Sequence, residues 1–166
     1  MSFFLSTRSK EKLIKVEDGL AVCVKKAIHI TKVDFGVIEG LRTPERQLEL
    51  YEKGASQIKE GGKHVLGLAV DLVAYIGPRA SWELNLYDDI ADAMKASALE
   101  LGISLRWGAA WHRNLTDFEG TSEELMNEYI DLRRSEGRRP FIDAPHFELN
   151  WQDPYLSEMK RATILS

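Results

Sequence analysis

The segment KHVLGLAVDL, residues 63–72, constrains the fold more than any other stretch, because it places ionisable side chains in an apolar, strand-like run. Asp71 lies inside a β-rich sequence that continues to Ile76 and ends before Gly77-Pro78. Burial of an ionised carboxylate is costly unless a positive group compensates it. The fold must therefore bring a positive group to Asp71, and a bound metal cation is one such group.

The residues around Asp71 have the types and spacing of a zinc site. A strand has a period of two, so Ala69, Asp71 and Val73 share a face, and the small Ala69 leaves space beside the carboxylate. His64 comes just before this strand, and His146 begins a predicted strand over 145–150. His64, Asp71 and His146 would form a three-ligand zinc site whose fourth position stays open to water, as in catalytic zinc sites.

The other histidines and the tryptophans give weaker signals. His29 lies on a predicted helix without an acidic neighbour at ligand spacing, so we expect a surface or core role for it. His112 follows Trp111 in a polar loop and could line a cleft together with Trp107 and Trp111. Packing in the core is the alternative, which we expect for at least two of the residues Trp82, Trp107 and Trp111.

Two further residues have types suited to amide hydrolysis. Asp143 precedes His146 by three positions, so its carboxylate could take a proton from the attacking water and deliver it to the leaving amine. A turn residue before Pro145 is an equally good explanation of Asp143. Arg42 lies between a predicted strand and a helix cap, where it could stabilise an oxyanion or hold a substrate carboxylate; a surface arginine is the alternative.

Glu148 is a candidate for a supporting role. It lies two positions after His146, on the same face of a regular strand, where its carboxylate could orient a histidine ligand.

The order of predicted elements indicates an α+β fold. Helices are expected over 9–31, from Thr43-Pro44 to near Gly54, over 81–101 and over 121–137; short strands are expected over 34–40, 66–76, 103–108 and 145–150. The strands do not alternate regularly with crossover helices. We therefore expect helices around a small, mainly antiparallel sheet that carries the zinc site.

Length and charge limit the classes of protein that remain. The 166 residues suit one domain with a sizeable hydrophobic core. The net charge of −4 argues against nucleic acid as a partner, and we expect the basic run RRSEGRR at 133–139 to be a solvated helix end. A single cysteine, Cys23, permits no intrachain disulfide. No signal peptide or membrane-spanning run is apparent, so we expect synthesis in the cytoplasm without membrane insertion.

The order of four motifs resembles a known family. GLRT (40–43), KHVLGLAVDL (63–72), LRWGAAW (105–111) and DAPHFEL (143–149) are similar to motifs of the zinc metallopeptidases that include D-alanyl-D-alanine carboxypeptidases and, above all, phage L-alanyl-D-glutamate endopeptidases used as endolysins. The resemblance spans about 8–150. It implies one zinc ion on His64, Asp71 and His146, a catalytic carboxylate at Asp143 and a transition-state arginine at Arg42. Gly62 stands where members often have a serine, so the resemblance does not imply that serine's hydrogen bond beside the metal or to the substrate, while the metal site is unaffected. The segment 113–140 is longer than in the shortest members, which implies a helical insertion over 121–137 near the cleft. The resemblance also implies a single catalytic domain without a separate cell-wall-binding domain.

The resemblance also implies a substrate and a place of action. The substrate would be the stem peptide of bacterial peptidoglycan, cut between L-Ala and D-Glu by a monomer that stays in the host cytoplasm until lysis and then reaches the cell wall. A D,D-carboxypeptidase that releases terminal D-Ala is one alternative, with Arg42 holding the free carboxylate. A non-catalytic, zinc-stabilised binding module is another, although a structural zinc needs neither Asp143 nor Arg42.

Overall fold

The computed structural model describes residues 2–56 and 62–150, in which five α-helices, a short 3-10 helix and five strands are formed. The helices are α1 (Thr7–Lys12), α2 (Asp18–Ile30), α3 (Pro44–Glu52), α4 (Leu84–Leu101), η1 (Leu115–Asp117) and α5 (Ser122–Ser135). The strands are β1 (Asp34–Glu39), β2 (Ala69–Ile76), β3 (Arg79–Ser81), β4 (Leu105–Trp107) and β5 (His146–Leu149).

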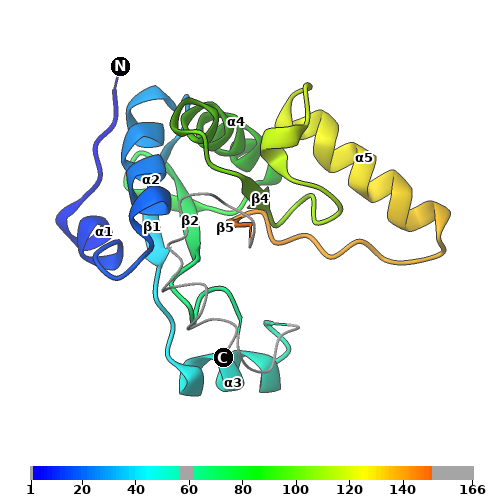
Figure 1. Ribbon diagram of the computed structural model, residues 1–166, viewed down its shortest axis with the longest axis horizontal. Coiled ribbons are helices and arrows are strands. Elements are labelled where there is room, and N and C mark those ends of the chain that lie inside the picture. The colour runs from blue at the N-terminus through cyan, green and yellow to red at the C-terminus, as the bar shows by residue number, and fades with distance from the viewer. Residues whose placement is uncertain (1, 57–61, 151–166) are drawn as a thin grey trace.

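The strands form one sheet with the order β1-β2-β5-β4, and β3 pairs with β2. All of these pairs are antiparallel, which confirms the α+β prediction. Helices α2 and α4 lie close to the sheet, whereas α3 and α5 extend away from it in different directions (Figure 1). Strand β5 lies between these two projecting helices (Figure 1).

The hydrophobic core lies on one face of β2 and β5. Val70, Leu72, Phe147 and Leu149 are completely buried, and alternation along each strand turns the residues between them to the opposite face. Apolar side chains of α2 and α4 complete the core on the first face, among them Leu20, Val24, Ile90 and Met94. The opposite face of the same two strands is therefore free to carry polar groups.

The helix predicted over 9–31 is two helices in the structure. Its apolar periodicity is right, because Val16, Leu20 and Val24 are all buried. Its continuity is wrong: the chain turns over 13–17, and the backbone N–H of Glu17 donates to the carbonyl of Gly67 instead of a helical partner. This tertiary hydrogen bond satisfies a backbone donor at the start of α2, where no helical carbonyl is available.

The other helix boundaries follow the local sequence closely. Thr43 caps α3 by accepting from the N–H of Arg46, and Thr121 with Glu124 forms a capping box at the start of α5. Gly102 ends α4 with a φ of 72°, a left-handed conformation that glycine adopts easily. Ser81 does not begin α4 as predicted, because it pairs with Ala74 as the last residue of β3. Residues 57–61, which follow α3, lie outside the described part.

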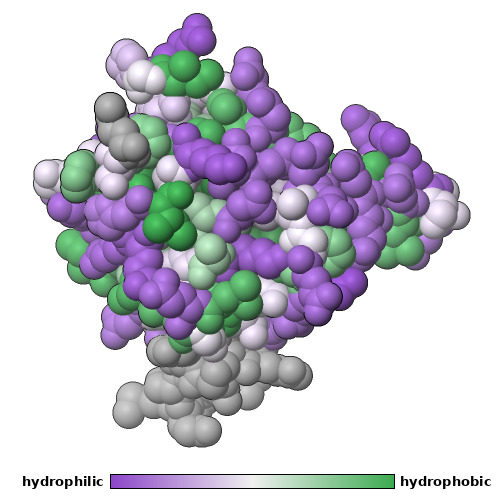
Figure 2. Space-filling view, turned by 90° about the horizontal axis from the view of Figure 1, so that it is seen from above, coloured by the Kyte–Doolittle hydropathy of each residue, from purple (hydrophilic) through white to green (hydrophobic). Residues whose placement is uncertain are grey.

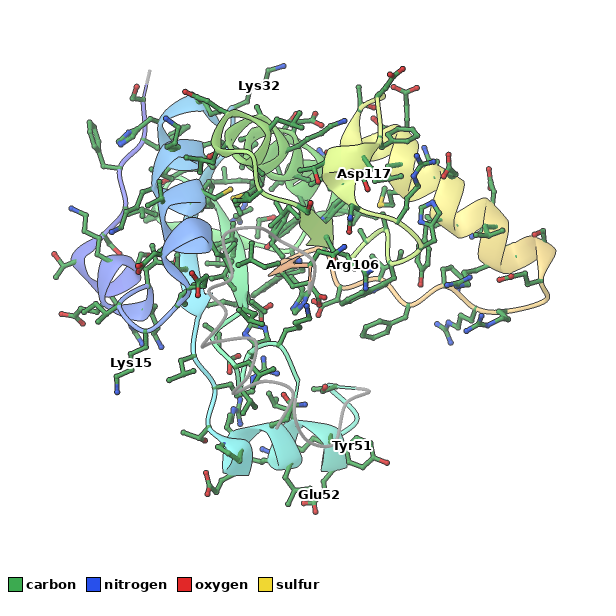
Figure 3. All side chains as sticks on the ribbon, viewed as in Figure 1. Lys15, Lys32, Tyr51, Glu52, Arg106 and Asp117 are labelled. Atoms are coloured by element: carbon green, nitrogen blue, oxygen red, sulfur yellow. The ribbon has the colours of Figure 1, made fainter. Side chains whose placement is uncertain are left out.

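The surface is mixed in character. On the face seen in Figure 2, small apolar groups lie between larger hydrophilic areas. Lys15, Lys32 and Glu52 point outward, whereas Arg106 lies near the centre of the molecule, on β4 (Figure 3). Across the described residues, no helix combines the length and apolar character needed to cross a membrane.

Candidate metal centre and active site

The polar face of the sheet brings together residues that are far apart in the sequence. His146 of β5 is paired with Asp71 of β2, and Glu148 is paired with Ala69. A bulge near the end of β1 places Glu39 opposite Asp71. Glu39, Asp71 and His146 therefore form a row across three neighbouring strands.

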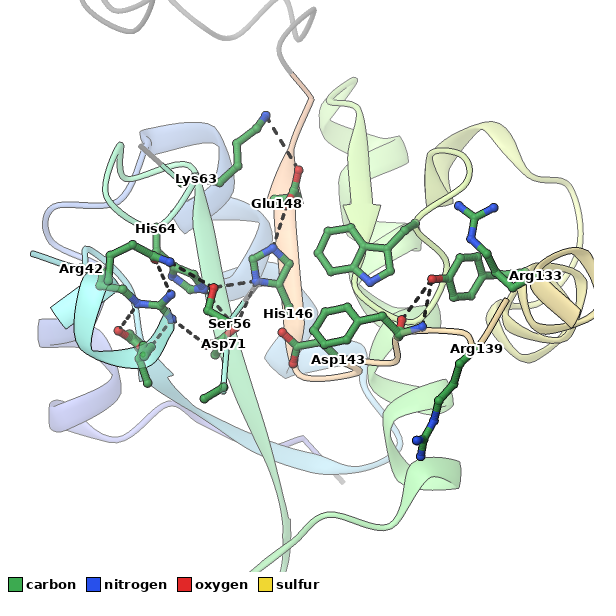
Figure 4. A pocket seen from close by; sticks show the side chains of 18 of the residues that line it. Arg42, Ser56, Lys63, His64, Asp71, Arg133, Arg139, Asp143, His146 and Glu148 are labelled. Atoms are coloured by element: carbon green, nitrogen blue, oxygen red, sulfur yellow. Dashed lines mark hydrogen bonds and ion pairs between the residues drawn. The ribbon is translucent and has the colours of Figure 1, made fainter. Parts of the chain in front are cut away.

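His64 joins this row from the turn before β2. The loop after β1 holds it twice: the N–H of Arg42 donates to the carbonyl of His64, and the His64 Nδ1 lies 3.0 Å from the carbonyl of Gly40. The His64 side chain is almost completely buried. Its Nε2 is thereby directed at Asp71 and His146 (Figure 4).

The three candidate ligand atoms form a nearly equilateral triangle. His64 Nε2 lies 3.1 Å from Asp71 Oδ1 and 3.2 Å from His146 Nδ1, and the third side of the triangle, from His146 Nδ1 to Asp71 Oδ1, is 3.3 Å. Ligands about 2.0–2.1 Å from a tetrahedral ion are about 3.3 Å apart by geometry. No other group of three or more potential ligands comes this close within residues 2–56 and 62–150.

The outer nitrogens of the two imidazoles define their tautomers. His64 Nδ1 faces the Gly40 carbonyl, whose oxygen can only accept a hydrogen bond. His146 Nε2 lies 2.8 Å from Glu148 Oε1, which can likewise only accept when the carboxylate is ionised. The outer nitrogens therefore carry protons, and in neutral rings the inner nitrogens present lone pairs. Two lone pairs and a carboxylate that converge on one point fit a divalent transition metal.

The pKa values of His146 and Asp71 also indicate that a positive charge is favoured between these two side chains. Burial alone would lower the pKa of His146, but its hydrogen bonds with Asp71 and Glu148 outweigh burial and raise the pKa to about 10. Burial tends to raise the pKa of Asp71, yet the hydrogen bonds from His146 and His64 bring it well below its usual range. A proton on His146 thus occupies the place that fits a cation.

Asp143 lies in the turn that leads into β5. Its backbone is fixed by a hydrogen bond from its N–H to the Gly108 carbonyl. A side chain at Gly108 would have its Cβ only 2.1 Å from the Asp143 carbonyl oxygen, so glycine is needed for this close approach. Burial raises the pKa of Asp143, and the negative charge of Asp71 raises it further. In the described chain, no hydrogen bond or ion pair engages its carboxylate.

Arg42 is buried beside the ligands, not on the surface. Its Nε and Nη2 bind both oxygens of Glu39 at 2.6 and 2.9 Å, and its Nη1 donates to Gln47 at 2.8 Å. Nη2 also lies 3.5 Å from the second oxygen of Asp71. The guanidinium is therefore held rigidly against a ligand carboxylate.

A cavity of about 480 Å³ opens over this group and is lined by His64, Asp71, Asp143 and His146. Trp111 lines it as predicted, with its ring 5.2 Å from that of His146. Trp107 does not line it: the side chain is completely buried and its Nε1 donates to the carbonyl of Ala144, which supports the turn between Asp143 and His146.

Two further residues from the sequence analysis, His112 and Trp82, do not line the cavity. His112 does not line the cavity, because its Nε2 binds Glu128 at 2.7 Å and its ring packs on Tyr129. Trp82 is largely exposed, so Trp107 is the one tryptophan of the predicted set that is fully buried.

The polar residues of the cavity that sequence reasoning missed include Glu39, Gln47 and Lys63. The spacing of Glu39 from Arg42 was the available signal for an ion pair. Lys63 lies 3.9 Å from Glu148 Oε2, and burial lowers the pKa of Lys63 to about 8, an effect that the Glu148 carboxylate only partly offsets. Its position directly before His64 gave no indication of this contact.

Comparisons with known proteins agree with this geometry. The sequence model of the phage L-alanyl-D-glutamate peptidase family matches residues 1–150. The L-alanyl-D-glutamate peptidase of Escherichia phage T5 is 30% identical over 115 residues, which are 68% of this chain and 84% of that protein. The crystal structure of the Serratia marcescens L-Ala D-Glu endopeptidase ChiX is similar, with a TM-score of 0.69, 31% identity, and coverage of 90% of this chain and 92% of that one. The chain belongs to the phage L-alanyl-D-glutamate peptidase family.

Proposed function

We propose that this protein is a zinc-dependent peptidase that hydrolyses the L-Ala–D-Glu bond in the stem peptide of bacterial peptidoglycan. Family membership supports the peptidase class and the bond. The observation that carries the proposal is the convergence of three candidate ligand atoms in a triangle with sides of 3.1–3.3 Å. In the same cavity, the carboxylate of Asp143 has no hydrogen-bond or ion-pair partner among the described residues. A metal that only stabilised the fold would not need that carboxylate.

His64, Asp71 and His146 are the proposed ligands, and their donor set suits zinc. When bound, zinc supplies the Lewis acidity that makes a water molecule nucleophilic near neutral pH and polarises the scissile carbonyl. Glu148 accepts from the outer nitrogen of His146, which keeps the inner nitrogen available to the metal.

Asp143 is the proposed general base and general acid. Its carboxylate lines the cavity with the ligands and has no hydrogen-bond partner in the described chain, so its oxygens are available for an attacking water. After accepting the proton of that water, Asp143 returns it to the nitrogen of the departing D-Glu. The raised pKa of Asp143 suits the first transfer, because a stronger base accepts the proton of the water more readily.

Arg42 is proposed to act on both ligand and substrate. The contact of Nη2 with Asp71 fixes the orientation of the ligand carboxylate. Glu39 and Gln47 hold the remaining guanidinium edges, which leaves one N–H of Nη1 without an acceptor among the described residues. That N–H is proposed to donate to the oxyanion that forms at the scissile carbonyl.

The place of action follows from the substrate. We propose that the protein acts on the cell wall during host lysis, as a monomer whose catalytic unit lies within residues 1–150, the part that the family model matches.

Asp143→Asn provides the main test, with cleavage products of purified peptidoglycan identified by mass spectrometry. Wild-type protein should produce fragments with a new N-terminal D-Glu, and Asp143→Asn should lose this activity while still binding one zinc ion. Asp131→Asn, at an exposed position of α5, is the matched control and should behave as wild type. Released D-Ala would instead establish a D,D-carboxypeptidase, and zinc binding without any cleavage would indicate a binding module.

A further inference from the structure

The charges that line the cavity are distributed unevenly. On the side of β1 and α3, Arg42 is paired with Glu39; at the opening above β5, Lys63 is paired with Glu148. The side formed by the end of α5 and the segment after it is different, since three of the four arginines in the run 133–139 line the cavity: Arg133, Arg138 and Arg139. The expectation that this run is merely a solvated helix end is therefore incomplete.

Arg139 is the cation of this side that remains available. Arg133 binds Glu136 at 2.9 Å and lies over the ring of Tyr129, and Arg138 lies 3.8 Å from Glu136. Within the described chain, no hydrogen bond, ion pair or ring contact engages the guanidinium of Arg139. Arg139 is also exposed, so an anion from solution can reach its guanidinium.

The backbone directs Arg139 toward the site. The segment from Arg139 to Asp143 has no regular secondary structure, and its alternate residues Arg139, Phe141 and Asp143 all line the cavity. Pro140 restricts Arg139 itself to extended conformations. Figure 4 shows Arg139 and Arg133 on one side of Asp143 and His146, with Arg42 and Ser56 on the other.

The same segment is anchored to α5. The Tyr129 hydroxyl donates to the Phe141 carbonyl and lies within hydrogen-bond distance of the Phe141 N–H, both at 3.2 Å. The Phe141 ring also stacks on Trp111, with centroids 6.1 Å apart. Arg139 thus lies two residues from a fixed point, in a segment that ends at the proposed catalytic carboxylate.

We infer that Arg139 binds the free carboxylate of the D-glutamate that follows the scissile bond, so that this residue lies on the α5 side of the cavity. The inference rests on the proposed function. A glutamate within a peptide keeps one carboxylate that the chain does not use, and the leaving nitrogen belongs to the same residue. Asp143 must reach that nitrogen, so the carboxylate lies on the side of Asp143, where Arg139 offers two parallel N–H donors.

The test compares two synthetic peptides that contain an L-Ala–D-Glu bond, one with the free carboxylate and one with a carboxamide in its place. With the zinc-loaded protein, Arg139→Gln should lower kcat/KM for the carboxylate peptide by about tenfold or more. It should leave kcat/KM for the carboxamide peptide nearly unchanged. Arg139→Lys should recover part of the loss, since it keeps the charge but not the paired donors. The loss should shrink as salt is raised.

Arg134→Gln is the matched control, because Arg134 belongs to the same exposed run but does not line the cavity. It should affect the two peptides equally and weakly. Calorimetry supplies a readout that does not depend on turnover: the released peptide with an N-terminal D-Glu should bind wild type more tightly than Arg139→Gln. Equal effects of Arg139→Gln and Arg134→Gln on the carboxylate peptide would overturn the inference. Failure of wild type to cleave either peptide would instead overturn the proposed function.

Discussion

The two faces of the sheet at β2 and β5 differ sharply, although the same two strands form both faces. One face consists of apolar side chains such as Val70 and Phe147, which are completely buried against α2 and α4. The other face carries Asp71, His146 and Glu148, which are also mostly buried but touch one another. Two adjacent residues, His146 and Phe147, therefore belong to different environments.

This difference shows how a small domain separates stability from chemistry. Apolar burial stabilises the fold in proportion to the area removed from water. Buried charged groups contribute little net stability even when they are paired, because desolvation offsets their attraction. We therefore expect substitutions on the polar face to affect metal binding and catalysis first, and substitutions on the apolar face to affect the free energy of unfolding first.

His146→Ala should have the largest effect of these substitutions on zinc binding and catalysis, the two properties that depend on the polar face. Loss of one of three proposed ligands should abolish stoichiometric zinc binding, measured by metal analysis after dialysis, and reduce peptidoglycan cleavage by several orders of magnitude. The melting temperature should also fall below that of the metal-free wild-type protein, because Asp71 and Glu148 lose the buried imidazole that both of them bind. If the variant retains one tightly bound zinc ion per chain, the proposed ligand set is wrong.

Phe147→Ala tests the apolar face at the next residue. The ring is completely buried and stacks on Trp107, so its removal should lower the free energy of unfolding by about 3–5 kcal/mol, measured by denaturant titration. Phe4→Ala is the control, since Phe4 is 76% exposed and should change stability by less than about 0.5 kcal/mol. The folded fraction of Phe147→Ala should still bind zinc; a folded variant without zinc would contradict the separation of the faces.

Glu148→Gln should have a moderate effect that is confined to the polar face. The substitution keeps an acceptor near His146 but removes its charge, and we expect zinc affinity to fall by about tenfold, near the lower end of the range for such supporting residues. Glu128→Gln is a matched control, because Glu128 also binds a histidine at 2.7 Å but away from the cavity. Competition with a chromophoric chelator measures both affinities, and an equal loss in the two variants would remove the special role of Glu148.

Asp88→Asn should have the smallest effect and shows what happens to a carboxylate without a cation. Burial and the charges of Glu123, Asp92 and Asp89 raise the pKa of Asp88 to about 6. A raised pKa means that the folded protein holds the proton of Asp88 more tightly than the unfolded chain does. Stability therefore falls as the pH rises from the usual pKa of an aspartate to about 6, and it stays lower above that pH. Asn should therefore stabilise the protein at pH 7.5, by less than about 1 kcal/mol after allowance for solvent screening.

The sign of the Asp88 effect can be checked by its pH dependence. The gain in melting temperature should be present at pH 7.5 and vanish at about pH 3, where Asp88 is protonated in the folded protein and mostly protonated in the unfolded chain. A gain that is the same at both pH values would show that charge repulsion is not its cause.

Much of this architecture could be predicted from local patterns. The caps at Thr43 and Thr121 and the stop at Gly102 depend on hydrogen bonds and backbone angles within a few residues, so the sequence shows them directly. Other predictions failed where a distant partner decides the outcome. The break between α1 and α2 depends on the Gly67 carbonyl, and the position of His112 depends on Glu128.

The sequence by itself determined which residues can serve as ligands and which face of each strand they occupy, because residue type and a period of two are local properties. Only the tertiary structure decided that β5 pairs with β2 in the register that sets His146 opposite Asp71. It also decided that the run 133–139 turns three arginines toward the same cavity. Register and convergence are properties of contacts between segments, and the packing of the whole core selects them, so no single segment encodes them.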